Sequence, residues 1–198
     1  MYYLDKTSYE IAITFLYITI SFIIGGIPFG LILSKLIKKT DIRKFGSGNI
    51  GATNVFRLMG FKYAALTFIL DGLKSYLPVL IAKKLFGFGF AINVLCATTL
   101  GHIFSPWLKF HGGKGFSSFM LGILAIDVKL FMTSAITWLF IFFIGHISAM
   151  ATLISTFVTV TSACFLYKFV AIPVIFLMLV IFWAHRKNIK GMVDSFKN

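Results

Sequence analysis

Acidic side chains are scarce in this sequence: Asp and Glu together number six, against 19 Lys and Arg in 198 residues. Their scarcity excludes a carboxylate pair for acid/base catalysis and a carboxylate cage for a hard metal ion. The two cysteines, Cys96 and Cys164, stand alone in apolar stretches. They form no zinc cluster or disulfide spacing and are typical of buried packing residues. The sequence therefore predicts no metal site and no cofactor.

Charge of either sign is also rare, since only 13% of the residues are charged, against roughly a quarter in an average soluble domain. Apolar residues make up 59% of the chain, and the mean hydropathy is +0.93. This composition predicts an all-α, polytopic membrane protein built as a helical bundle. No Pro- or Ser-rich linker divides the chain, so residues 1–198 are expected to form one integral membrane domain. Apolar runs occur at 11–34, 63–82, 88–108, 116–127, 130–145, 149–167 and 169–184.

The number of membrane crossings depends on the run at 116–127. A dozen helical residues rise only about 18 Å, against a hydrocarbon core of roughly 30 Å. This segment must thin the bilayer, re-enter, or be shielded by its neighbours. The sequence favours seven transmembrane helices, with five as the alternative.

Basic clusters follow the first and last apolar runs. The net charge of +13 would suggest nucleic acid in a soluble protein, but here the charges lie at the ends of apolar runs, as the positive-inside rule requires. Both clusters are therefore expected in the cytoplasm, which makes the number of crossings odd and places the amino terminus outside. No nucleic-acid partner is predicted. The clusters are Lys35, Lys38, Lys39, Arg43 and Lys44, and Arg186, Lys187, Lys190 and Lys197.

A first polar segment, residues 46–57, is rich in glycine and amide residues. Glycines allow backbone N–H groups to converge on phosphate oxygens, while Ser47, Thr53 and Arg57 supply further donors. The alternative reading is a tight turn with helix caps. The segment reads Gly46-Ser47-Gly48-Asn49-Ile50-Gly51-Ala52-Thr53-Asn54-Val55-Phe56-Arg57.

A second polar segment, residues 101–115, ends in Gly112-Gly113-Lys114-Gly115. It is not a Walker A sequence, because Leu108 stands where that motif needs its first glycine. Nucleotide hydrolysis is therefore disfavoured. Backbone amides and a lysine charge still suit an anion, and the alternative is a flexible hinge.

A third polar stretch, residues 184–190, leaves the last apolar run. His185 and Asn188 are three residues apart and would share one helical face. The alternative for His185 is an interfacial side chain. Within the membrane, Asp71 and Lys74 are spaced so that each can neutralise the other, and a structural pair is favoured over a substrate or proton pathway.

These three segments, in this order and with these spacings, resemble the bacterial acyl-phosphate:glycerol-3-phosphate acyltransferases of the PlsY type. Residues 47–57 are similar to the family's first motif, 101–115 to its second, and 185–189 to the start of its third. Further similarity lies at 27–30, 41–44 and 70–74. The chain differs where it has Phe116-Ser117-Ser118, His111 at a frequent lysine, and no closing Gly-x-Glu.

The resemblance implies transfer of an acyl group from acyl phosphate to the 1-hydroxyl of glycerol 3-phosphate, giving lysophosphatidic acid and phosphate. It implies a multi-pass protein of the bacterial inner membrane that serves phospholipid biosynthesis, with its active site facing the cytoplasm. The upstream enzyme that forms the acyl phosphate is a candidate partner. A membrane transporter or binding protein for a phosphorylated metabolite is the alternative function.

The resemblance also implies roles for individual residues. The catalytic set is His185, Lys114 and Ser47, and the proton acceptor is either His185 or a substrate phosphate. Glycerol 3-phosphate would be bound by Ser47, Arg57, Lys114, His185 and Asn188, and acyl phosphate by Thr53, Gly113 and Ser148. Loop order would depend on Gly48, Asn49, Gly51, Asn54, Gly112, Gly115 and His102.

Overall fold

The computed structural model describes residues 6–195, and all regular elements in that range are helical. The prediction of an all-α chain is therefore confirmed for these residues. Lys197, part of the predicted carboxy-terminal basic cluster, lies outside them. The α-helices are α1 (Lys6–Gly25), α2 (Phe29–Lys38), α3 (Ala52–Met59), α4 (Phe61–Phe86), α5 (Phe88–Ile103), α6 (Phe116–Ile126), α7 (Val128–Gly145), α8 (Ser148–Leu166), α9 (Ala171–Ala184) and α10 (Arg186–Ser195), with short 3-10 turns at Ile42–Lys44, Pro106–Leu108 and Lys168–Val170.

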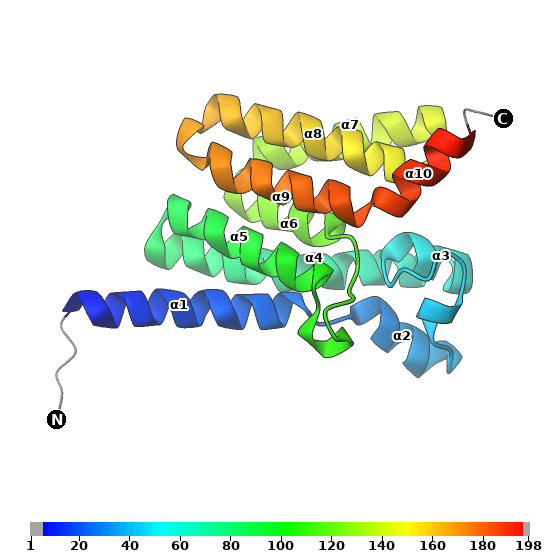
Figure 1. Ribbon diagram of the computed structural model, residues 1–198, viewed down its shortest axis with the longest axis horizontal. Coiled ribbons are helices and arrows are strands. Elements are labelled where there is room, and N and C mark those ends of the chain that lie inside the picture. Colours follow the sequence, from blue (N-terminus) through cyan, green and yellow to red (C-terminus); the bar gives the residue numbers. More distant parts are fainter. Residues whose placement is uncertain (1–5, 196–198) are drawn as a thin grey trace.

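The long helices run back and forth along one axis of the bundle (Figure 1). Helix α4 packs on α5 and α6, α1 packs on α5, and α7 pairs with α8. The start of α1 lies at one end of the bundle, and α2, α3 and α10 lie at the other (Figure 1). The polar segments between these helices consequently meet at a single end.

Glycine and aspartate mark several helix boundaries. Gly60 and Gly87 have φ values of 83° and 84°, in the region that glycine adopts without a steric penalty, and they separate α3 from α4 and α4 from α5. Asp127 caps α7, because its carboxylate accepts hydrogen bonds from the N–H groups of Lys129 and Leu130.

The apolar run at 11–34 forms two helices, which corrects the expectation of a single continuous one. Helix α1 ends at Gly25, and α2 starts at Phe29 directly after Pro28. Proline has no N–H and disfavours helical geometry in the residue before it, so a break here follows from the sequence. Together the two helices still form a candidate span over Ser8–Lys38.

Five segments within residues 6–195 are long and apolar enough to cross a membrane, and a sixth is added if the bent pair at Lys168–Ala184 and Arg186–Asp194 forms one span. Helix α6 is a shorter apolar helix. It begins only after residues 112–115 have folded back against the end of α5, which leaves it 11 residues. Each of the seven predicted apolar runs thus contains an α-helix.

Lys74 pairs with Asp71 inside the bundle, with Nζ 2.7 Å from Oδ1. Both side chains are buried. The expected pairing is therefore confirmed. Ser118 on α6 donates to the Asp71 carbonyl oxygen at 2.8 Å, so the pair lies where α4 contacts α6. The main buried apolar cluster contains residues of the six helices α4 to α9.

Candidate active site

The first polar segment is organised around the Asn54 side chain. The Asn54 amide nitrogen donates to the carbonyl oxygens of Phe45 and Asn49, at 2.9 and 2.8 Å. Its oxygen accepts from the Ser47 N–H at 3.1 Å. Asn54 is 1% exposed, so one buried amide holds the loop that presents Ser47 and Asn49.

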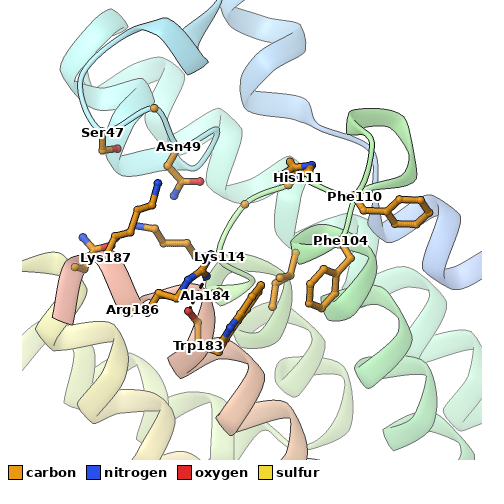
Figure 2. A pocket seen from close by; sticks show the side chains of 15 residues that line it. Ser47, Asn49, Phe104, Phe110, His111, Lys114, Trp183, Ala184, Arg186 and Lys187 are labelled. Carbon is orange, nitrogen blue, oxygen red and sulfur yellow. Dashed lines mark hydrogen bonds between the residues drawn. The ribbon is translucent and has the colours of Figure 1, made fainter. Parts of the chain in front are cut away.

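The second polar segment folds back along the end of α5. The N–H groups of Gly112 and Gly113 donate to the carbonyl oxygens of Ile103 and His102, each at 2.9 Å. A Cβ at Gly113 would lie 2.1 Å from His102 Nε2. Glycine is therefore required here, because the backbone rests directly against the imidazole. Lys114 follows, with its side chain directed into the space between the loops (Figure 2).

The third segment lies at the bend between α9 and α10. Here His185 Nδ1 is 2.8 Å from the Ile181 carbonyl oxygen. A carbonyl cannot donate, so Nδ1 must carry the proton and Nε2 is the acceptor in neutral His185. On the other side of the bend, Arg186 stacks over Trp183 at 4.0 Å and donates to its carbonyl oxygen at 3.0 Å.

A pocket of about 400 Å³ lies where the three segments meet. Ser47 and Asn49 lie on one side of it, and Arg186 and Lys187 lie on another (Figure 2). Phe104 and Trp183 form an aromatic wall, with ring centroids 5.6 Å apart. The lining residues are Ser47, Gly48, Asn49, Ile103, Phe104, Phe110, His111, Gly112, Gly113, Lys114, Trp183, Ala184, Arg186, Lys187 and Asn188.

Lys114 is the half-buried cation of this pocket, and its Nζ donates to Asn188 Oδ1. Burial, assisted by the charge of Arg57, lowers the pKa of Lys114 to about 8. No carboxylate lines the pocket among the described residues. Its positive charge is therefore available to an anion from solution.

Burial lowers the pKa of His185 to about 4, and the charge of Lys114 contributes in the same direction, against the opposing hydrogen bond to Ile181. His185 is consequently neutral at pH 7. The side chain is only 4% exposed and does not line the pocket. It lies between Ala184 and Arg186, which both line the pocket.

The predicted site residues fall into three groups. Ser47, Gly113, Lys114 and Asn188 line the pocket, together with Gly48, Asn49 and Gly112. Thr53 and Ser148 form a separate contact, with hydroxyl oxygens 3.4 Å apart. Arg57, Gly51, Asn54, His102, Gly115 and His185 lie outside the lining set.

Eight lining residues were not predicted as site residues: Ile103, Phe104, Phe110, His111, Trp183, Ala184, Arg186 and Lys187. Arg186 and Lys187 followed an apolar run, so the positive-inside rule already accounted for them and hid a second role. Phe104 and Trp183 are two of many aromatic residues in an apolar chain. Phe104 and Trp183 are 79 positions apart in the sequence, and only their contact in the folded protein identifies the wall. No local sequence pattern predicts it.

Within residues 6–195, no group of three His, Cys, Asp or Glu side chains is placed to hold a metal ion. What the pocket offers is a cluster of cations with the Ser47 hydroxyl and the side-chain amides of Asn49 and Asn188, beside an aromatic surface. Such a set binds a phosphate and stabilises developing negative charge. The fold and pocket define a membrane protein whose site is built for an anionic, partly apolar reactant.

Comparison with known proteins agrees with this class. The family model described as glycerol-3-phosphate acyltransferase matches residues 15–195. A protein of that name from Wolbachia sp. subsp. Brugia malayi is 38% identical over 180 residues, covering 89% of this chain and 93% of that one. Another from Allorhizobium ampelinum is 36% identical over 203 residues, covering 97% and 94%.

The fold is similar to crystal structures of PlsY (YgiH), an integral membrane glycerol 3-phosphate acyltransferase. Its glycerol 3-phosphate form gives a TM-score of 0.88 at 32% identity, with 92% of each chain covered. A second form, with lysophosphatidic acid, gives 0.86 at 31% identity. The chain belongs to the glycerol-3-phosphate acyltransferase family, and it is a multi-pass integral membrane enzyme that acylates glycerol 3-phosphate.

Proposed function

We propose that the acyl donor is an acyl phosphate and that the products are lysophosphatidic acid and inorganic phosphate. The observation that carries this proposal is the pocket itself, where cations and the Ser47 hydroxyl, without a carboxylate, lie beside the aromatic Phe104–Trp183 wall. Both proposed substrates bear phosphate, and the donor also carries an apolar chain.

In the proposed reaction, the 1-hydroxyl oxygen of glycerol 3-phosphate attacks the acyl carbonyl carbon. A new ester C–O bond forms, the C–O bond to phosphate breaks, and phosphate leaves with the bonding electrons. Phosphate is a good leaving group, so the enzyme's contribution is to position the reactants and to stabilise charge.

The hydroxyl proton is proposed to pass to a phosphate of a substrate. The second ionisation of a phosphate monoester has a pKa of about 6, which makes it a stronger base than His185 with its pKa of about 4. His185 is also buried and lies outside the pocket lining. In this scheme it supports the bend from which Asn188 reaches Lys114.

Ser47, Lys114 and Asn188 are proposed to bind glycerol 3-phosphate, joined by Arg57. Although Arg57 is not in the pocket lining, its charge acts on Lys114, and it is solvent-exposed. A long guanidinium side chain can turn toward a bound phosphate. Thr53, Ser148 and Gly113 are proposed to hold the phosphate of the donor. The Thr53–Ser148 contact supports this assignment because it brings two hydroxyl groups together from distant segments.

The chain is proposed to form one domain with seven crossings in the bacterial inner membrane. The basic clusters of segments 35–44 and 186–190 lie at the pocket end of the bundle (Figure 1). By the positive-inside rule that end faces the cytoplasm, and the start of α1 faces the opposite side. Glycerol 3-phosphate would then enter from water and the acyl donor from the bilayer. The enzyme that produces the acyl phosphate is the proposed upstream partner.

Purified protein in detergent tests the donor directly. It should release phosphate from palmitoyl phosphate only when glycerol 3-phosphate is present, with one lysophosphatidic acid formed per phosphate released. A Lys114→Ala preparation serves as the matched control for spontaneous hydrolysis. Absence of coupled release, together with glycerol 3-phosphate uptake into liposomes, would overturn the proposal in favour of a transporter.

A further inference from the structure

Asp71 lies in the bundle directly behind the loop that carries Lys114. It is 0% exposed, and the neighbouring His102 is 3% exposed. His102 Nδ1 lies 3.8 Å from Asp71 Oδ1. On its other side, the imidazole of His102 rests against the Gly113 backbone, where no Cβ would fit. The three residues thus form a continuous line from helix α4 to the loop.

Lys74 fixes the carboxylate at the other end of this line. Its Nζ lies 2.7 Å from Asp71 Oδ1 and 2.5 Å from the carbonyl oxygen of Ile27. Ile27 lies in the break between α1 and α2, where the carbonyl groups lack regular helical partners. Lys74 therefore ties the carboxylate to the broken first span as well as to its own helix.

Pairing with Lys74 does not account for everything at this junction. Among the described residues, three buried side-chain atoms lack a hydrogen-bond partner: Asp71 Oδ2, Thr99 Oγ1 and His102 Nδ1. Thr99 and His102 are three residues apart on α5 and so share one face. Burying polar groups without partners is costly, and a carboxylate kept only to neutralise Lys74 would not require a threonine and a histidine beside it.

The loop touches the same two α5 residues. The N–H of Gly113 donates to the His102 carbonyl oxygen, and a Cβ at Gly115, whose φ is 88°, would lie 3.0 Å from Thr99 Cγ2. Lys114 lies between these two glycines. The Ile103 side chain packs at the same point as Thr99. In so closely packed an interior, a shift of His102 or Thr99 is expected to move the backbone that carries the Lys114 side chain.

We propose that Asp71 is a positioning residue for acyl transfer: held by Lys74, the negative charge of its carboxylate, 3.8 Å from His102 Nδ1, orients the imidazole, and through it the Gly113–Gly115 backbone that directs Lys114 toward the substrate phosphate. This inference rests on the role of Lys114 proposed above. The pair is then part of the catalytic architecture as well as of the fold.

The decisive variant removes both charges of the pair. Asp71→Asn alone leaves Lys74 buried without a counter-charge, and breaking a buried pair from one side destabilises strongly. Asp71→Asn/Lys74→Met avoids this, so we expect it to be purified as a folded, monodisperse protein. Because the Lys114 ammonium group would be displaced from its position for binding phosphate, kcat/KM should fall roughly 10- to 100-fold, with a raised KM for glycerol 3-phosphate.

The KM separates positioning from folding. A loss of folded enzyme lowers the rate per total protein but leaves KM unchanged, whereas a displaced Lys114 weakens capture of the phosphate. Ser134→Ala is the matched control, since it removes a buried contact between α7 and α8, to Ser155, and should leave KM unchanged. A double variant with wild-type KM and kcat would overturn the proposal and return the pair to a purely structural role.

Equilibrium dialysis with radiolabelled glycerol 3-phosphate gives an answer that does not depend on the acyl donor. The double variant should bind glycerol 3-phosphate at least about tenfold more weakly than wild type, because Lys114 is displaced. If wild type binds glycerol 3-phosphate but transfers nothing from acyl phosphate, the proposed donor fails while this comparison still tests Asp71. Equal binding by wild type and double variant would contradict the positioning role.

Discussion

Lys74 and Lys114 are both withdrawn from water, yet their surroundings differ in one respect. Lys74 has a carboxylate at 2.7 Å and a backbone carbonyl at 2.5 Å. Lys114 has the neutral Asn188 as its side-chain partner and a second cation, Arg57, acting on it. A buried charge is costly unless it is paired. The protein itself supplies the partners of the Lys74 ammonium group. The charge of Lys114 has no carboxylate partner among the described residues and is proposed to bind the substrate phosphate.

Lys114→Ala should have the largest effect. The variant removes the cation that is proposed to bind phosphate and to stabilise developing charge, and loss of one such group costs roughly 100- to 1,000-fold in kcat. We expect acyl transfer to be abolished in the assay described above, with membrane insertion intact. Wild-type activity in a correctly inserted variant would contradict the assignment of Lys114 to the site.

Arg57→Ala should also abolish acyl transfer, and it tests the difference between the surroundings of Lys74 and Lys114. Loss of the guanidinium removes a phosphate ligand. It also removes a positive charge that lowers the pKa of Lys114, so that pKa should rise. Titration of a lysine-specific label at Lys114 against pH measures this shift, with Lys187→Ala as a control that removes a different pocket cation. An unchanged titration curve would show that the two cations are not coupled.

The pH dependence of substrate binding tests the state of Lys114 directly. Its pKa is lowered to about 8, from about 10.4 for a free lysine. Lys114 is charged below that value and loses its charge as the pH rises through it. KM for glycerol 3-phosphate should therefore begin to increase near pH 8, about two units earlier than for an exposed lysine. A KM that stays flat to pH 10 would mean that Lys114 keeps its charge or does not bind the phosphate.

Asn188→Ala should have an intermediate effect. The variant removes the hydrogen-bond partner of Lys114 but leaves the charge, and a hydrogen bond to a charged group contributes about 1.5 to 3 kcal/mol. We expect a loss of about 10- to 100-fold in kcat/KM, smaller than for Lys114→Ala. Asn188→Asp would match Lys114 with a carboxylate, as Asp71 matches Lys74. It should be the more damaging change, and higher activity than Asn188→Ala would contradict that reasoning.

The sequence was sufficient for the helices and for the gathering of three polar segments at one end. Apolar runs separated by glycine, proline and basic residues determine the helices, and the spacing of Asp71 and Lys74 predicted their pairing. It was insufficient where one feature serves two purposes. Arg186 and Lys187 satisfied the positive-inside rule and so concealed a place in the pocket wall.

Long-range contacts were the other gap. The support of Gly113 by His102, and the facing of His102 toward Asp71, depend on how α4, α5 and the returning loop pack together. No local pattern encodes that arrangement. Likewise, the chemistry of Pro28 explains the break between α1 and α2 once it is seen. The hydrogen bond from Lys74 Nζ to the Ile27 carbonyl oxygen at that break has no counterpart in any local sequence pattern.

The smallest effect is expected at an ion pair on the surface of the pocket end, which extends the comparison from buried to exposed charges. Arg43 lies 2.6 Å from Asp41, and their hydrogen bond, against a smaller effect of desolvation, holds the pKa of Asp41 well below its usual range. A carboxylate whose pKa is lower in the folded state stabilises the fold at pH values above its unfolded-state pKa. This stabilisation is lost as the pH falls through the folded-state pKa. Because the pair is solvent-exposed, Asp41→Asn should cost no more than about 1 kcal/mol at pH 7. Thermal unfolding in detergent should show that small difference vanish in strong acid, and a large loss at neutral pH would reveal a role for Asp41 beyond this pair.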